Sequence, residues 1–184
     1  MGFNSDVGRS LHELHVSIGN LIDDNLSSGF RLVRDMACIR EGDIRQQIPL
    51  FFSDEKSRKT EYCNVDLLVI HDGKIRVIVE IEESNVTPTQ ICGKFLTSAL
   101  ARYYIHENEG NVPIGMHDSV TFIQVVGTSR LKSLSAKPYQ WKNLESSIEN
   151  ILPIKDSNIK EYRLFTDLEL KELVNHILEL IGNL

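Results

Sequence analysis

Asn64–Glu83 reads NVDLLVIHDGKIRVIVEIEE, two runs rich in Val, Ile and Leu that meet at an Asp-Gly pair. Such a pair between two apolar runs predicts a β-hairpin. The runs also carry three acids, Asp66, Glu80 and Glu82, where apolar residues are usual. Carboxylates are seldom buried without a partner, because the loss of hydration costs more free energy than packing returns. If the three side chains share one face, they form an acidic pocket that a divalent cation would neutralise.

The facing of the acids depends on the turn, because successive side chains of a strand alternate between the two faces of a sheet. A two-residue loop, Asp72-Gly73, would pair His71 with Lys74 and turn the first two acids to opposite faces. A three-residue loop from His71 to Gly73 would pair Ile70 with Lys74 and put all three acids on one face. We predict the three-residue loop because the odd-numbered face of the hairpin is wholly apolar. That face consists of Val65, Leu67, Val69, Ile75, Val77, Val79 and Ile81.

Composition and charge are those of a soluble globular protein. The 184 residues include 41% hydrophobic and 25% charged residues, which predicts a single domain over residues 1–184. The formal net charge of −6 argues mildly against a polyanionic partner. However, residues 143–184 hold eight acidic and four basic residues, whereas residues 29–60 hold seven basic and five acidic ones. This distribution permits a nucleic-acid partner.

The remaining global patterns favour a cytoplasmic location. Cys38, Cys63 and Cys92 lie far apart in the sequence, so we expect free thiols rather than a zinc or disulfide site. Residues 1–14 lack the apolar segment of a signal peptide, and no apolar run approaches the length of a membrane span. We therefore expect a cytoplasmic protein without membrane association.

Hydrophobic periodicity predicts the order of elements along the chain. An apolar stripe from Val7 to Ile22 predicts a first helix, residues 30–40 a strand, and residues 53–61 an exposed loop; residues 44–52 suit either strand or loop. After the hairpin, Thr87 and Pro88 predict the start of a helix through residues 89–105. Residues 119–129 predict a strand, and residues 141–151 and 166–181 predict helices. The sum is an α/β fold with a mixed sheet.

This order of elements, with Asp66 opening one central strand and Glu80-x-Glu82 closing the next, resembles the PD-(D/E)xK nuclease superfamily, which includes restriction endonucleases. The resemblance implies a restriction-endonuclease-like αβββαβ core: a helix, a three-strand meander, a helix and a further strand. It covers about residues 7–128, and residues 140–184 would add a helical extension at the C-terminus. It also implies that Asp66 is the Asp of the motif and Glu80 its second acid.

The chain departs from the common motif at Glu82, where most members have Lys. One branch of restriction endonucleases is similar to this chain in having Glu at that place, and it is active. Lys94 on the following helix is a candidate for the missing positive charge. Many members also take a Glu from the first helix, for which Glu13 is the candidate, and we interpret the flanking His12 and His15 as surface residues.

The chemistry that the resemblance implies is hydrolysis of DNA phosphodiester bonds. Asp66, Glu80 and Glu82, with Glu13 as a further candidate, would hold Mg²⁺, or Mn²⁺ as a substitute, to polarise the phosphate and activate water. Glu82 would bind a second metal ion or accept a proton from the attacking water. Glu80 and Glu82 would lie about 7 Å apart at their α-carbons. Three adjacent acids without a cation should also have raised pKa values.

The first functional hypothesis is therefore a Mg²⁺-dependent endonuclease that acts on DNA, expected to be double-stranded, as a homodimer with one site for each strand. The alternative is a catalytically inactive nuclease-like domain that binds nucleic acid or a protein partner. A third hypothesis is an unrelated α/β interaction protein that binds neither metal nor DNA. The structural alternative for the three acids is either a solvated sheet face or salt bridges to Arg76 and other basic residues.

Overall fold

The computed structural model describes residues 13–40, 42–83, 86–132 and 135–182. These residues form four α-helices, one short 3-10 helix and an eight-stranded sheet. In chain order the elements are α1 (Glu13–Asp23), β1 (Phe30–Arg34), β2 (Pro49–Phe51), β3 (Glu61–Asn64), β4 (Leu67–His71), β5 (Lys74–Glu82), α2 (Pro88–Leu100), β6 (Tyr103–Tyr104), η1 (Glu107–Glu109), β7 (Ile114–Val126), α3 (Lys137–Ile151), β8 (Ile159–Thr166) and α4 (Leu170–Gly182). None of the helices in the described ranges is long and apolar enough to cross a membrane.

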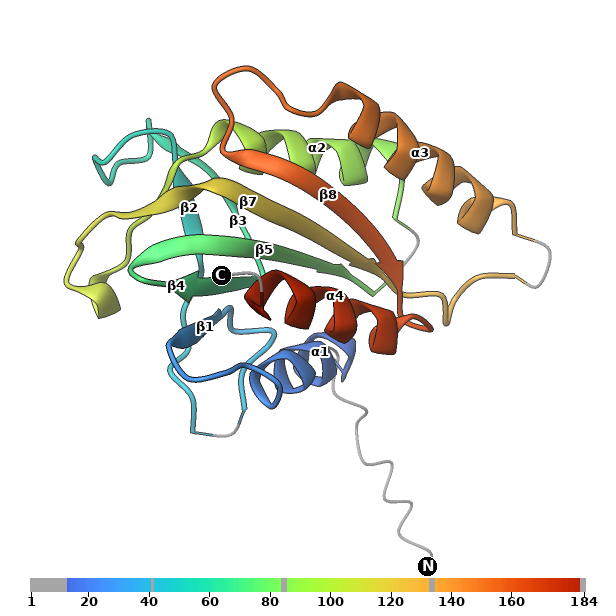
Figure 1. The fold of residues 1–184 in the computed structure, drawn as a ribbon, viewed down its shortest axis with the longest axis horizontal. Helices are drawn as coiled ribbons and strands as arrows, with labels where there is room; N and C mark the ends of the chain where they lie inside the picture. The colour runs from blue at the N-terminus through green and yellow to red at the C-terminus, as the bar shows by residue number, and fades with distance from the viewer. Residues whose placement is uncertain (1–12, 41, 84–85, 133–134, 183–184) are drawn as a thin grey trace, which may run out of the picture.

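The sheet is mixed, and β7 belongs to both of its parts. In the main part, β1 pairs with β4 and β4 with β5 in antiparallel fashion, whereas β5, β7 and β8 are parallel (Figure 1). The first residues of β7 pair instead with β6, which continues to β2 and β3. The carboxyl ends of β5, β7 and β8 therefore lie at one edge of the sheet.

The β4–β5 hairpin places the acids as expected but by a different route. Its loop has two residues, Asp72 (φ 50°) and Gly73 (φ 68°), and pairs His71 with Lys74, so the prediction of a three-residue loop is wrong. A bulge at Arg76 then shifts the register, because the partner changes from Ile75 for Ile70 to Val77 for Val69. Beyond the bulge Leu67 pairs with Val79, so the side chains of Asp66, Glu80 and Glu82 point to the same face.

The bulge also moves two residues out of the apolar face that the sequence predicted. Leu67, Val69, Val77, Val79 and Ile81 pack together on one side of the sheet as expected, but Val65 and Ile75 belong to the core on the other side. Both sides of the hairpin are thus buried. A strand buried on both faces gains from an irregularity that keeps every large apolar side chain out of water.

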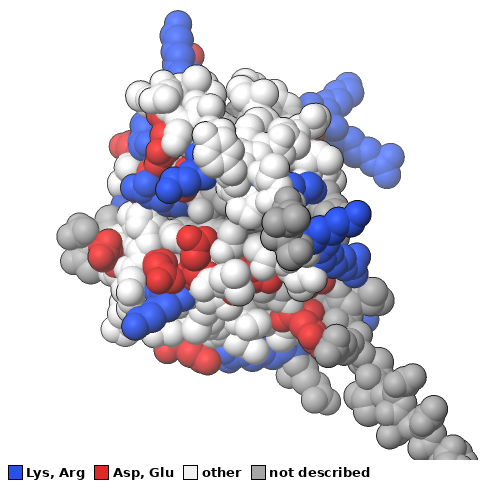
Figure 2. All heavy atoms as spheres, turned by 90° about the vertical axis from the view of Figure 1, so that its right-hand side faces the viewer, with Lys and Arg blue, Asp and Glu red and all other residues white. Residues whose placement is uncertain are grey.

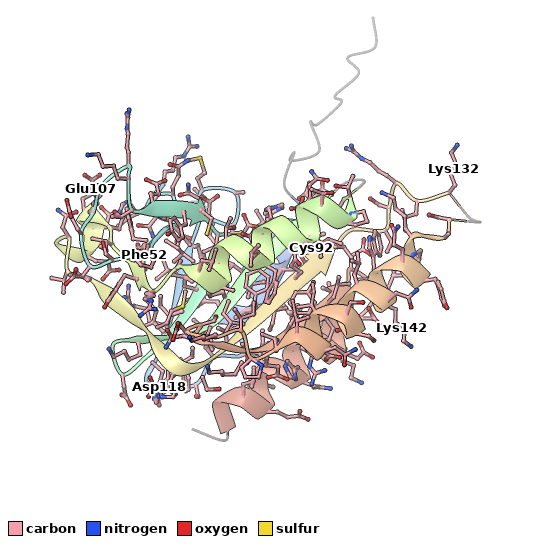
Figure 3. The ribbon with its side chains drawn as sticks, turned by 90° about the horizontal axis from the view of Figure 1, so that it is seen from above. Phe52, Cys92, Glu107, Asp118, Lys132 and Lys142 are labelled. Atoms are coloured by element: carbon pink, nitrogen blue, oxygen red, sulfur yellow. The ribbon has the colours of Figure 1, made fainter. Side chains whose placement is uncertain are left out.

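Two helices cover each face of the sheet. α2 and α3 lie side by side on one face, where Figure 3 labels Cys92 on α2 and Lys142 on α3, and α1 and α4 lie on the other face (Figure 1). The core under α2 and α3 includes Leu68, Ile78, Ile91, Phe95, Phe122, Trp141, Ile148 and Tyr162. The core under α1 and α4 includes Ile18, Ile22, Leu67, Val79, Ile123, Leu173 and Ile177. The expected α/β fold with a mixed sheet between helices is confirmed.

The predicted helices agree with the structure in part. α2 begins as predicted, since the Thr87 side chain accepts the backbone N–H of Gln90 and the Gln90 side chain accepts the backbone N–H of Thr87. It ends at Leu100 rather than at residue 105, because Tyr103 and Tyr104 form β6. The prediction for the first helix is met from Glu13 onward; its residues Val7 and Leu11 lie outside the described ranges.

The region after residue 140 is not the purely helical extension that the sequence predicted. β8 pairs with β7 from Ile159 to Thr166 and is therefore part of the sheet. The alternation of buried and exposed side chains along β8 is weak, because only Ile159 and Tyr162 of its eight residues are fully buried. α4 begins at Leu170 rather than at Thr166, and the Glu169 side chain accepts hydrogen bonds from the N–H and hydroxyl of Thr166.

Candidate active site

Three acids and one lysine meet near the carboxyl end of β5. Asp66 directly precedes β4, Glu80 and Glu82 lie on β5, and Lys94 projects from α2. The structure thus brings the three acids that the sequence singled out into one cluster together with Lys94. Figure 2 faces the end of the molecule toward which β5 and β7 run, and it shows Asp and Glu side chains across the middle of that end with Lys and Arg side chains around them.

Glu80 is the most buried member of the cluster, with 1% of its side chain exposed. Its Oε2 accepts a hydrogen bond from Lys94 Nζ at 2.7 Å, but Oε1 is buried and no donor among the described residues reaches it. Burial raises the pKa of Glu80 well above its ordinary value, and the charge of Asp66 and a hydrogen bond between the two carboxyl groups add to this effect, against the opposing effect of Lys94. The pKa of Glu80 is therefore raised, chiefly by burial and only secondly by the clustering of acids that the sequence led us to expect.

Lys94 joins the two glutamates of the motif. Its ammonium lies 2.7 Å from Glu80 Oε2 and 2.9 Å from Glu82 Oε1. Partial burial lowers the pKa of Lys94, but the neighbouring carboxyl groups, Glu80 foremost, together raise it by more. The net pKa is above the ordinary value for lysine, so Lys94 is a cation. Lys94, the candidate for the missing positive charge, thus lies beside both acids. Glu80 and Glu82 form salt bridges, as one structural alternative expected, and their basic partner is Lys94.

Asp66 is fixed by the backbone of the next strand. Its Oδ2 accepts the Ile81 N–H at 2.7 Å, and its carbonyl accepts the Asp35 N–H at 2.9 Å. Burial raises the pKa of Asp35 above its ordinary value, and the Asp66 charge adds to this effect. The Asp66 carboxylate is therefore held beside Glu80, and Asp35 is a further acid near it.

His15 also belongs to the site. It is buried on α1, with Nε2 at 3.8 Å from Asp66 Oδ2 and Nδ1 at 2.9 Å from Glu83 Oε1. The interpretation of His15 as a surface residue is therefore wrong. A signal was present in the sequence, because His15 lies three and seven residues before Ile18 and Ile22, on the buried stripe of the helix.

Glu13 does not join the cluster, whereas Glu83 contacts the helix that carries it. Glu13 is exposed at the first residue of α1, and no contact among the described residues joins it to the three acids. Glu83 directly follows β5 and accepts hydrogen bonds from the backbone N–H of Leu14 and His15, which fixes the start of α1 beside the site. His12 lies outside the described ranges.

Gly127 closes the site from the side of β7. Its N–H donates to the Glu82 carbonyl at 2.6 Å. A Cβ added there would lie 3.1 Å from the Glu83 carbonyl oxygen and 3.2 Å from the Glu82 carbonyl oxygen. Contacts this short would displace the neighbouring backbone by a few tenths of an ångström, so a glycine fits best where β7 ends beside β5.

The donor atoms of the site fit Mg²⁺ better than a metal that needs several protein ligands. Within residues 13–40, 42–83, 86–132 and 135–182, no three His, Cys, Asp or Glu side chains are grouped to hold a metal ion. Asp66 and Glu80 nevertheless present hard carboxylate oxygens close to each other, and no donor among the described residues reaches Oε1 of Glu80. Mg²⁺ commonly takes one or two carboxylates and keeps several waters, whereas zinc needs three or four protein ligands.

The comparisons with known proteins add no family to this geometry. No family model, no curated protein and no solved structure matches the chain.

Proposed function

We propose that this protein is a metal-dependent endonuclease that hydrolyses DNA phosphodiester bonds, with Asp66, Glu80 and Lys94 as its central residues. The observation that carries the proposal is the buried Glu80 side chain, which accepts a hydrogen bond from Lys94 on one oxygen, has no donor on the other, and lies against the Asp66 carboxyl. A buried carboxylate oxygen without a donor is costly, so such a group is retained where a cation or substrate completes it.

The order of elements supports the same proposal. The resemblance to PD-(D/E)xK nucleases implies a helix, a three-strand meander, a helix and a further strand, and α1, the antiparallel strands β1, β4 and β5, α2 and the parallel strand β7 occur in that order. In this interpretation β2 and β3 would be an insertion between the first two strands of the meander. The acids lie directly before β4 and late in β5, the two places that the resemblance implies for the motif.

Each residue of the site has a role in this proposal. Asp66 and Glu80 would hold Mg²⁺, or Mn²⁺ in its place, which when bound polarises the scissile phosphate and lowers the pKa of a water molecule. Lys94 would donate hydrogen bonds to the phosphate or orient the attacking water, and Glu82 positions Lys94 through its 2.9 Å contact. His15 and the Ile81 N–H orient Asp66. A homodimer would supply one site for each strand of a duplex.

The test is cleavage of supercoiled plasmid DNA in Mg²⁺ or Mn²⁺. We expect the wild-type protein to nick the plasmid, and Asp66→Asn and Glu80→Gln to slow nicking by at least about 100-fold. Glu172→Gln is the matched control, because Glu172 lies in the exposed first turn of α4. A wild-type protein without activity in either metal, or variants with wild-type activity, would contradict the proposal. Sedimentation of the protein with and without DNA tests the homodimer.

One observation favours the alternative of a nuclease-like domain that binds without cutting. Lys94 neutralises Glu80 and Glu82 at hydrogen-bond distance, so the acids have a counter-charge even without a metal ion. In this case the protein binds nucleic acid or a protein partner but leaves plasmid DNA intact. DNA binding in Ca²⁺ together with no cleavage in Mg²⁺ or Mn²⁺ is the result expected for this alternative.

A further inference from the structure

The β2–β3 hairpin exposes two aromatic rings side by side. Phe52 and Tyr62 are 47% and 42% exposed, and their ring centroids lie 5.7 Å apart with an angle of 30° between the planes. Large apolar side chains that lie together on a surface mark interaction sites more often than rings exposed singly. The stack is thus a candidate contact surface outside the acidic cluster.

A guanidinium group completes this surface. Arg102 lies with its Cζ 5.8 Å from the centroid of the Phe52 ring, and its Nη2 donates to the Asp156 carbonyl at 3.4 Å. Arg102 follows α2, and Figure 3 shows the labelled Phe52 beyond the carboxyl-terminal end of that helix. Two rings and a guanidinium plane together form the kind of surface on which nucleobases stack.

The tip of the hairpin is ordered and carries basic side chains. The Phe52 N–H donates to the Thr60 carbonyl at 2.8 Å, and the Thr60 hydroxyl donates to the Glu55 carbonyl at 2.6 Å. Three basic residues lie between them, namely Lys56, Arg58 and Lys59. Three acids of the same hairpin, namely Asp54, Glu55 and Glu61, balance this charge. Because these charges cancel, a nucleic acid bound here would gain most of its affinity from stacking on the rings rather than from net charge.

The hairpin leads directly to the candidate active site. Asp66 follows Tyr62 by four residues, which is at most about 13 Å of extended chain. A hollow of about 380 Å³ lies alongside β3. It is lined by Arg58, Glu61, Tyr62, Cys63 and Asn64. Cys63 Sγ contacts Ser98 Oγ of α2 at 3.6 Å, so β3 is held against the helix that carries Lys94.

We propose that the Phe52–Tyr62 stack and Arg102 bind unpaired nucleotides and guide that strand along β3 to Asp66. The substrate class is then a nucleic acid with a single-stranded segment, such as an overhang or a branched junction, because bases inside a duplex are stacked on each other and cannot stack on both rings. This inference rests on the proposed function, which gives nucleic acid as the partner. It adds that the hairpin binds the unpaired nucleotides of that partner.

The test is fluorescence anisotropy with a labelled 12-nucleotide single strand and with the duplex of the same sequence, both in EDTA. We expect the double variant Phe52→Ala/Tyr62→Ala to bind the single strand at least about tenfold more weakly and the duplex within about twofold of wild type. Tyr139→Ala is the control, since Tyr139 is 74% exposed on α3 and should bind both ligands as wild type does. Circular dichroism melting verifies that each variant is folded.

Three results would overturn the inference: equal binding of the single strand by the double variant and wild type, an equal loss for single strand and duplex, or no single-strand binding by wild type. The last result would assign the rings to a protein partner. EDTA separates this test from the proposed nuclease activity. If no metal supports cleavage but the rings still govern single-strand binding, only the nuclease proposal fails. If plasmid cleavage occurs while the double variant binds normally, only the hairpin inference fails.

Discussion

Replacement of Lys94 by Met tests the electrostatics of the site. The substitution keeps most of the side-chain volume but leaves the carboxylates of Glu80 and Glu82, which are 1% and 18% exposed, without their shared counter-charge. Loss of one partner of a fully buried ion pair costs about 3–5 kcal/mol. The Lys94 side chain is 37% exposed, so solvent screening reduces the expected loss to about 2–3 kcal/mol. For a chain of this length the melting temperature would fall by about 4–12 °C.

The loss of stability should depend on pH with a defined sign. The pKa of Glu80 is already raised in the folded protein, above the value of 4.5 that applies to the unfolded chain. Between 4.5 and the raised pKa, the folded state binds more protons than the unfolded state, so stability falls as the pH rises. Removal of Lys94 raises the pKa of Glu80 further and extends this range. The deficit of Lys94→Met relative to wild type should therefore be small near pH 5 and larger at pH 8.

Urea denaturation of wild type and Lys94→Met at pH 5 and pH 8 measures this difference. Lys171→Met is the control, since Lys171 is exposed in the first turn of α4 and should change stability by less than about 0.5 kcal/mol at both pH values. Mg²⁺ at millimolar concentration should restore part of the stability of Lys94→Met, because a divalent cation supplies the missing charge. A pH-independent deficit, or a variant as stable as wild type at pH 8, would refute the reasoning.

Three further substitutions test how the fold holds the site. Thr87→Ala removes the cap of α2 and should lower the free energy of unfolding by about 1 kcal/mol in urea denaturation, whereas Thr87→Ser should lose less. Phe95→Ala removes the ring that packs edge-on against Phe122 and Tyr162 and should cost about 3–5 kcal/mol in the same assay; a loss below about 1 kcal/mol would show that this core is loosely packed. Gly127→Ala should displace the Glu82–Glu83 backbone and reduce plasmid nicking more than it reduces the melting temperature, and an unchanged nicking rate would contradict this placement.

The sequence predicted the facing of the acids better than it predicted the turn. Burial of apolar residues on both sides of the hairpin requires a defined facing, but either a longer loop or a bulge can produce it. The protein uses a two-residue loop and a bulge at Arg76. The pattern of apolar residues therefore predicts which side chains share a face near Asp66. It does not predict whether a longer loop or a bulge produces that facing, because this depends on tertiary packing.

The elements that the sequence missed lack a strong local signal. β8 has only two fully buried residues, and its place in the sheet comes from parallel pairing with β7, which is distant in sequence. β6 has two residues, Tyr103 and Tyr104, and exists because β2 and the first residues of β7 flank it. Such tertiary pairing overrides the helical pattern that continues past Leu100.

The roles of His15 and Lys94 show what a single sequence can and cannot reveal about the site. The position of His15 on the buried stripe of α1 follows from helical spacing, so its burial was within reach. Lys94 lies 14 residues from Glu80 on a separate element, and only the packing of α2 on the sheet brings its ammonium to 2.7 Å from the carboxylate. The resemblance suggested Lys94 as a candidate for the missing positive charge, and the tertiary structure supplies the contact.

The central claim is that Asp66 and Glu80 form a site for a divalent cation. Isothermal titration calorimetry with Mn²⁺ at pH 7.5 tests it most directly, with wild type, Asp66→Asn, Glu80→Gln and the control Glu172→Gln. We expect saturable binding by wild type and the control, and a loss of binding in both site variants. Absence of Mn²⁺ binding by wild type, or equal binding by Glu80→Gln, would contradict the claim.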